Sequence, residues 1–135
     1  MPPPPFEELE HTADWSLLVK GETLESLFTN ASEGMLSLLE PEYLDPDPAR
    51  RLIKLNAIDI ESLLVSFLDE LLFLLETESC AMRDITLNIE GNALRASAKC
   101  VPVGAMSKHI KAVTYNELEI TREQGFYQTK LVFDV

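Results

Sequence analysis

A leucine-rich segment near the middle of the chain constrains the fold more than any other feature of the sequence. From Asp59 to about Glu76, apolar residues at helical spacing cover most of the girth of the predicted helix. They are Leu63, Leu64, Phe67, Leu68, Leu71, Leu72, Leu74 and Leu75. Asp59 is a suitable N-cap for this helix. We therefore expect a largely buried core helix, and because Asp69 and other acidic residues interrupt the apolar run, we exclude a membrane span.

The rest of the chain predicts one more helix and several strands. Thr23 is a suitable N-cap for an amphipathic helix that Pro41 would end. Alternating or β-rich segments predict strands at 6–10, 15–20, 51–57, 85–89, 94–100, 112–121 and 126–133, with turns at 90–92 and 123–125. This order predicts an α+β fold, in which two helices pack on a mostly antiparallel or mixed β-sheet.

The length of 135 residues fits a single compact domain with one hydrophobic core. Residues 1–5 contain four successive prolines and predict a flexible extended arm, so we place the domain at 6–135. No signal-peptide pattern precedes the domain. Cys80 and Cys100 lack metal-ligand spacing and occupy apolar or alternating surroundings, so we expect buried free thiols in a reducing, cytoplasmic environment.

The charge balance limits the classes of partner. Eleven basic and 23 acidic residues give a net charge of −12. Such a chain is expected to repel the phosphate backbone, so we expect no direct binding of nucleic acid. A cation or a basic protein suits this charge better, although the charge could also serve solubility alone.

Few residues form a recognisable chemical motif. The sequence has no phosphate-binding glycine loop, no histidine pair at metal-ligand spacing and no glycine-flanked nucleophilic serine, so an enzyme is the minority interpretation. The segment His11 to Asp14 interrupts two strands, and Asp134 and Val135 end the last strand. Their carboxylate and carbonyl oxygens are ligands that calcium or magnesium prefers. Aspartates at strand ends are usually solvated or capping residues, so from chemistry alone the metal site is the less common interpretation.

Several motifs along the chain match a known family. They are FEELEHTAD at 6–14, GETLESLF at 21–28, DELLFL at 69–74, IKAVTY at 110–115 and VFDV at 132–135. With these motifs the chain resembles the archeases over nearly its whole length. The resemblance implies that the first and last strands are adjacent. The chain departs from many relatives at two places. It has Asn116 where they often have histidine, and its connection from Pro102 to His109 is shorter.

The resemblance also implies a function. Archeases activate RNA ligases of the RtcB type, which join RNA ends through a guanylated histidine of the ligase, using GTP and manganese. The chain would then be a non-catalytic activator with a calcium-like divalent cation, magnesium or manganese being alternatives, at Asp14, Asp134 and Val135. His11, Lys111 and Tyr115 are candidate partner contacts. A metal-dependent phosphoester hydrolase and a chaperone-like interaction protein remain alternatives.

Overall fold

The computed structural model describes residues 2–9, 15–44, 47–106 and 108–135, which form two helices and eight strands. The strands are β1 (Phe6–Leu9), β2 (Trp15–Gly21), β3 (Ala49–Asn56), β4 (Cys80–Glu90), β5 (Ala93–Pro102), β6 (Ala112–Val113), β7 (Thr121–Glu123) and β8 (Phe126–Asp134). The helices are α1 (Leu24–Leu39) and α2 (Ile60–Glu78). All strand pairs among these elements are antiparallel. The predicted α+β class, with two helices in one compact domain, is confirmed.

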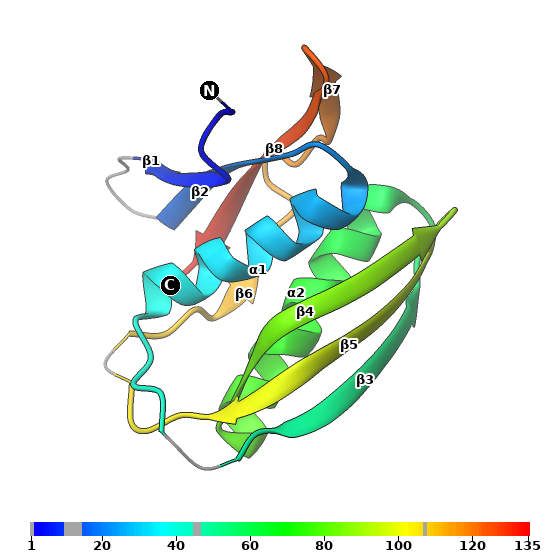
Figure 1. Cartoon of the computed structure of the whole chain (residues 1–135). Helices are drawn as coiled ribbons and strands as arrows, with labels where there is room; N and C mark the ends of the chain where they lie inside the picture. The colour runs from blue at the N-terminus through cyan, green and yellow to red at the C-terminus, as the bar shows by residue number, and fades with distance from the viewer. Residues whose placement is uncertain (1, 10–14, 45–46, 107) are drawn as a thin grey trace.

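The strands divide into two sheets, with the helices between them (Figure 1). One sheet has the order β1-β2-β8-β6, with β7 also paired to β8, and the other has the order β3-β5-β4. Helix α1 contacts β2 on one side and β4 on the other, and α2 contacts β4, β3 and β6. The first and last strands lie in the same sheet, with β2 between them.

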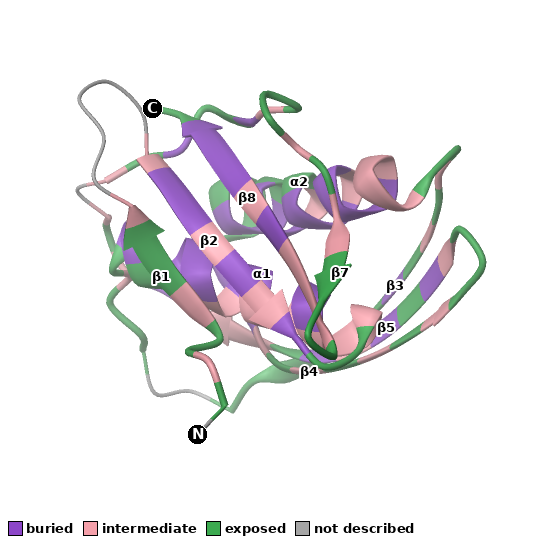
Figure 2. Cartoon of the chain, turned by 90° about the horizontal axis from the view of Figure 1, so that it is seen from above, coloured by how far each residue is buried: buried purple, intermediate pink, exposed green. Residues whose placement is uncertain are grey.

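This arrangement explains why α2 is apolar around most of its girth. Its leucines at 63, 64, 68, 71, 72, 74 and 75 are all buried, because each sheet covers a different side of the helix layer. Phe28 of α1 and Phe67 of α2 join the two helices, with ring centroids 5.9 Å apart. In Figure 2, the buried stretches of α1 and α2 lie directly behind those of β2 and β8.

Both helices begin at the predicted residues. The side chain of Thr23 accepts a hydrogen bond from the Ser26 N–H (3.0 Å), and the Ser26 hydroxyl accepts one from the Thr23 N–H (2.9 Å). The carboxylate of Asp59 accepts a hydrogen bond from the Ser62 N–H at 2.7 Å. The first helix ends at a left-handed Glu40, immediately before Pro41.

The predicted strand at 112–121 is wrong in its middle. Only Ala112–Val113 and Thr121–Glu123 pair with β8, and a turn separates them. In this turn Glu117 has a φ of 59°, and the Leu118 N–H donates to the carbonyl oxygen of Tyr115 at 3.1 Å. A left-handed residue inside the segment prevents continuous pairing.

Strand β4 begins five residues before the predicted start, because a bulge hides its first half from the alternation pattern. The register with β5 shifts between Arg83 and Thr86, where Asp84 has a φ of 51°.

The expectation of free thiols is also wrong, because Cys80 of β4 and Cys100 of β5 form a disulfide. Their Cα atoms are 5.3 Å apart, a usual separation for such a bridge. The two cysteines are diagonal neighbours in the sheet, since Cys80 lies opposite Pro102 and Cys100 opposite Met82. The sequence could not indicate this pairing without the register of the strands.

Neither of the two described helices is long and apolar enough to span a bilayer.

Candidate metal and partner-contact site

The end of β8 lies between two other strands and presents Asp134. On one side Phe133 pairs with Trp15, the first residue of β2, and on the other side Asp134 pairs with Ala112 of β6 (Figure 1). Phe133 is fully buried, whereas Asp134 is exposed, as strand alternation requires. The sheet therefore fixes the backbone at Asp134 firmly and leaves its carboxylate open to solvent.

The chemistry of Asp134 and Val135 suits a hard cation. No described residue is hydrogen-bonded to the Asp134 carboxylate or forms an ion pair with it. Its carbonyl oxygen is already used, because it accepts a hydrogen bond from the Lys111 N–H at 2.7 Å. Val135, the next residue, is 38% exposed. Carboxylate and main-chain carbonyl oxygens are the ligand types that calcium prefers.

Two of the sequence-derived candidates, Asp14 and His11, lie outside the described residues, so the distance from Asp14 to Asp134 is not tested. Trp15 follows Asp14 in the sequence and pairs with Phe133, which precedes Asp134. Within the described ranges alone, no three His, Cys, Asp or Glu side chains lie close enough together to hold a metal ion.

The structure brings Lys111 beside Asp134 and fixes the segment that follows. The N–H and the hydroxyl of Thr114 both donate to the carbonyl oxygen of Val132, at 3.0 and 2.9 Å. Tyr115 follows this anchor and is 59% exposed, although it is a large aromatic residue. Lys111 and Tyr115 thus lie beside the end of β8 that carries Asp134, and both residues are exposed.

Asn116 belongs to the turn after Tyr115. Its N–H donates to the Thr114 hydroxyl at 3.2 Å, and the residue is exposed. The hydrogen bond uses only the backbone of Asn116, so the local turn does not depend on which side chain is present.

Sequence reasoning missed an acidic group that α2 contributes near this site. The carboxylate of Asp69 accepts a hydrogen bond from the backbone N–H of Val113, the residue paired with Phe133. Partial burial raises the pKa of the Asp69 carboxyl, and this hydrogen bond opposes part of the rise. The available signal was an aspartate within the most apolar segment of the chain.

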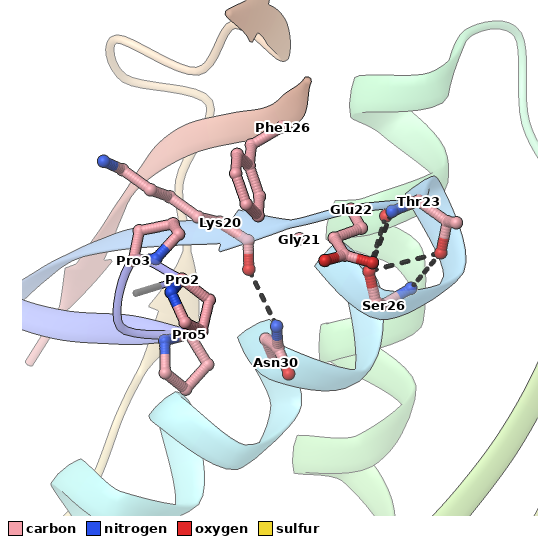
Figure 3. Close-up of a pocket in the computed structure, with 10 residues that line it drawn as sticks. All are labelled: Pro2, Pro3, Pro5, Lys20, Gly21, Glu22, Thr23, Ser26, Asn30 and Phe126. Carbon is pink, nitrogen blue, oxygen red and sulfur yellow. Dashed lines mark hydrogen bonds between the residues drawn. The ribbon is translucent and has the colours of Figure 1, made fainter. Parts of the chain in front are cut away.

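A separate pocket lies at the other end of β2 and does not include Asp134 or Lys111. Figure 3 shows this cavity of about 260 Å³, lined by the N-terminal prolines, the end of β2, the start of α1 and Phe126. Asn30 donates a hydrogen bond to the carbonyl oxygen of Lys20 at 2.7 Å. Thr23 and Ser26 use their polar groups to cap α1. The cavity therefore brings together prolines, helix-capping groups and one aromatic ring, and its charged residues are Lys20 and Glu22.

Comparison with known proteins identifies the family. The sequence pattern of the archease protein family matches residues 6–135. The chain is 34% identical to protein archease from Methanosarcina mazei, across 96% of this chain and 95% of the relative. It is 35% identical to protein archease from Pyrobaculum islandicum, across 93% and 92%.

Two solved structures share the fold over nearly their whole length. One is the solution structure of protein 1598 from Methanobacterium thermoautotrophicum, with a TM-score of 0.68 and 26% identity over 97% of this chain and 99% of that one. The other is the crystal structure of an archease from Thermotoga maritima, described as a possible chaperone, with a TM-score of 0.72 and 23% identity over 100% and 98%. From the family match and these relatives together, we conclude that the chain belongs to the archease family.

Proposed function

We propose that this protein is a non-catalytic activator of an RNA ligase of the RtcB type and acts in tRNA splicing or RNA repair. The observation that carries the proposal is the archease family match across residues 6–135. In this role the protein promotes guanylation of the ligase and allows repeated turnover. The guanylated histidine, the GTP site and the RNA ends all belong to the ligase, and the two proteins meet in the cytoplasm.

The proposal includes a divalent cation, calcium-like or else magnesium or manganese, held by Asp14, Asp134 and the main-chain oxygen of Val135. The antiparallel pairing of β2 with β8 supports it, because the start of β2 lies beside the end of β8. Three protein groups give fewer than the six to eight oxygen ligands that calcium prefers, so water or a ligase group completes the shell.

The ligase would contact the edge of the sheet around this cation. Lys111 and Tyr115 are exposed there, and His11 is the third candidate contact. The net charge of −12 suits approach to a basic, RNA-binding enzyme, since complementary charge mainly accelerates encounter.

A multiple-turnover ligation assay with the cognate ligase tests the proposal. Substoichiometric amounts of this protein should raise both guanylation and the number of turnovers, whereas the protein alone should join no RNA. If the ligase is indifferent to the protein, or the protein ligates RNA by itself, the proposal is wrong.

Two further measurements address the alternatives. Turnover of phosphoester substrates that is lost in Asp14→Ala would favour a hydrolase. Suppression of aggregation of unrelated proteins would favour a chaperone, since the protein from Thermotoga maritima is described as a possible chaperone.

A further inference from the structure

The outer face of the sheet β3-β5-β4 concentrates positive charge on an acidic protein. Arg50 and Lys54 of β3, together with Arg95 and Lys99 of β5, are exposed and alternate with inward residues such as Ile53. The helices cover the inner face of this sheet (Figure 1). The four cations are exposed and alternate with inward residues, so they lie on the outer face. Four of the 11 basic residues of the chain thus share one surface, which we call the basic face.

The register places these cations opposite one another. Arg50 pairs with Lys99, and Lys54 pairs with Arg95. Like charges directly opposite in an antiparallel pair destabilise a sheet. A chain with 23 acidic residues could easily place an acid in either position, so two unfavourable pairs in one sheet need an explanation outside folding.

Protection of a sheet edge does not provide that explanation. Charged residues often block unwanted pairing at an edge strand, and β3 is such a strand. However, Arg95 and Lys99 lie on β5, which has a partner on both sides.

Ion pairs neutralise only part of the basic face. Lys99 pairs with Asp84 at 3.1 Å, but no described acid forms an ion pair with Arg50, Lys54 or Arg95. Elsewhere, four basic residues each form an ion pair with a glutamate: Arg51, Arg83, Lys108 and Lys130.

Beside Arg95, next to the turn between β4 and β5, the surface is slightly hollowed and also carries one acid, Glu90. Asn88, Glu90, Ala93 and Arg95 line a depression of about 210 Å³. Leu52 lies between Arg50 and Lys54 on the same strand and is 72% exposed. It is the only large apolar side chain that is exposed in β3, β4 or β5, whose residues are all described. The core of a protein–protein interface is mainly apolar, whereas phosphate contacts need only cations and hydrogen-bond donors.

The acidic remainder of the molecule does not cancel this local charge. At physiological ionic strength the Debye length is about 8 Å, so exposed charges on distant surfaces are largely screened. The helix layer separates the basic face from the other sheet (Figure 1). A ligand at the basic face therefore responds mainly to the charges of that face.

We propose that the basic face binds the phosphate backbone of single-stranded RNA without preference for base sequence. This reverses the expectation from net charge, which averages over the whole surface. The proposal does not depend on ligase activation, because it concerns the isolated protein and a different surface from the Asp134 edge.

Fluorescence anisotropy with a labelled oligouridylate tests the proposal. Three to four cations should give a slope of about −2 to −3 for the logarithm of affinity against the logarithm of salt concentration, at about 0.7 per phosphate neutralised. Lys54→Gln/Arg95→Gln should reduce the magnitude of this slope by about 1.4. Lys20→Gln/Arg122→Gln removes the same charge elsewhere and should leave the slope unchanged. Arg95→Lys, which keeps the charge, should also preserve it.

Folding is checked in the same samples. Lys54→Gln/Arg95→Gln should melt no lower than the original protein, because it removes a like-charge pair. Absence of salt-dependent RNA binding, or equal weakening by the two double variants, would overturn the proposal. So would displacement of the RNA by poly-glutamate at a similar concentration of charged groups, which would make an acidic protein surface the ligand.

Discussion

Asp134 is exposed on a strand end that is paired on both sides, so its side chain can be changed with little effect on the fold. Asp134→Asn should weaken cation binding and ligase activation together, because the amide is a poorer ligand than the carboxylate. The free energy of unfolding should change by no more than about 0.5 kcal/mol, as is usual for an exposed site. Isothermal titration with calcium, the ligation assay and urea unfolding measure the three quantities.

Glu119→Gln is a matched control for this variant, since it also removes one exposed negative charge. It should leave cation affinity and activation unchanged. If both variants reduce activation equally, overall charge rather than a site at Asp134 would be responsible.

Asp69 has a pH-dependent effect on stability whose sign can be stated. Its pKa is raised in the folded protein, mainly by burial, so the folded state binds the proton more tightly than the unfolded state. The contribution of Asp69 to stability is therefore greatest below the ordinary pKa of aspartate and is lost as pH rises through the raised pKa.

Asp69→Asn should remove this pH dependence while keeping an oxygen that accepts the hydrogen bond from Val113. Urea unfolding across the acidic to neutral range should show the original protein losing stability relative to the variant as pH rises. If the original protein instead lost stability relative to the variant as pH fell, the hydrogen bond, and not burial, would determine the direction of the pKa shift of Asp69.

At the residue scale, sequence reasoning located some groups of the site and missed others. Asp134, Lys111 and Tyr115 were identified from motifs, and the structure places them together around the end of β8. The hydrogen bond of Asp69 and the bridge between Cys80 and Cys100 depend on contacts between elements, so the local sequence could mark Asp69 only as an aspartate within an apolar helix and could not indicate the bridge.

The connection from β2 to α1 is an element junction with no room for a side chain at Gly21. A Cβ atom there would lie 2.4 Å from the backbone nitrogen of Leu27, which the helix holds in place. Gly21→Ala should therefore destabilise the protein by about 1–3 kcal/mol, the usual range for overpacking.

Gly125→Ala is an informative comparison, because a Cβ atom at Gly125 would meet no other atom within 4 Å. Its φ of +82° still makes the substitution unfavourable, but for a backbone reason. Asparagine tolerates left-handed conformations, so Gly125→Asn should be more stable than Gly125→Ala. Gly21→Asn should be no more stable than Gly21→Ala. If Gly21→Asn were also more stable than Gly21→Ala, a small movement of the surrounding atoms would be relieving the crowding at Gly21.

Helices were easier to predict than strands for a physical reason. The ends of α1 and α2 depend on short-range groups, such as the Thr23 and Asp59 caps, which are visible in the sequence. Strand limits depend on partners that are distant in the chain. The bulge at Asp84 and the turn at Glu117 interrupt pairing without a proline or glycine to mark them.

At the scale of the whole molecule, the sequence predicted which residues face inward but not that the strands form two sheets. Alternation in β3 and β5 assigns one side of each strand to the core, and it does so equally well in one sheet or in two. Net charge has a similar limit, since a sum over the chain contains no information on where the cations gather. Only one sequence feature indicated two sheets: apolar residues surround most of α2, so this helix needs packing partners on both sides.

The enclosure of α2 between the two sheets can be tested by truncating two of its large apolar residues. Leu68 is fully buried within the helix layer, whereas Phe73 is 57% exposed. Leu68→Ala should lower the free energy of unfolding by about 2–5 kcal/mol, because it leaves a cavity that the packed layers cannot fill. Phe73→Ala should lower it by at most about 1 kcal/mol, although it removes more atoms, since those atoms are already largely in water. Urea unfolding of both variants under the same conditions gives the comparison. A loss of only a few tenths of a kcal/mol for Leu68→Ala would mean that α2 is not enclosed between the sheets, and the layer arrangement would be wrong.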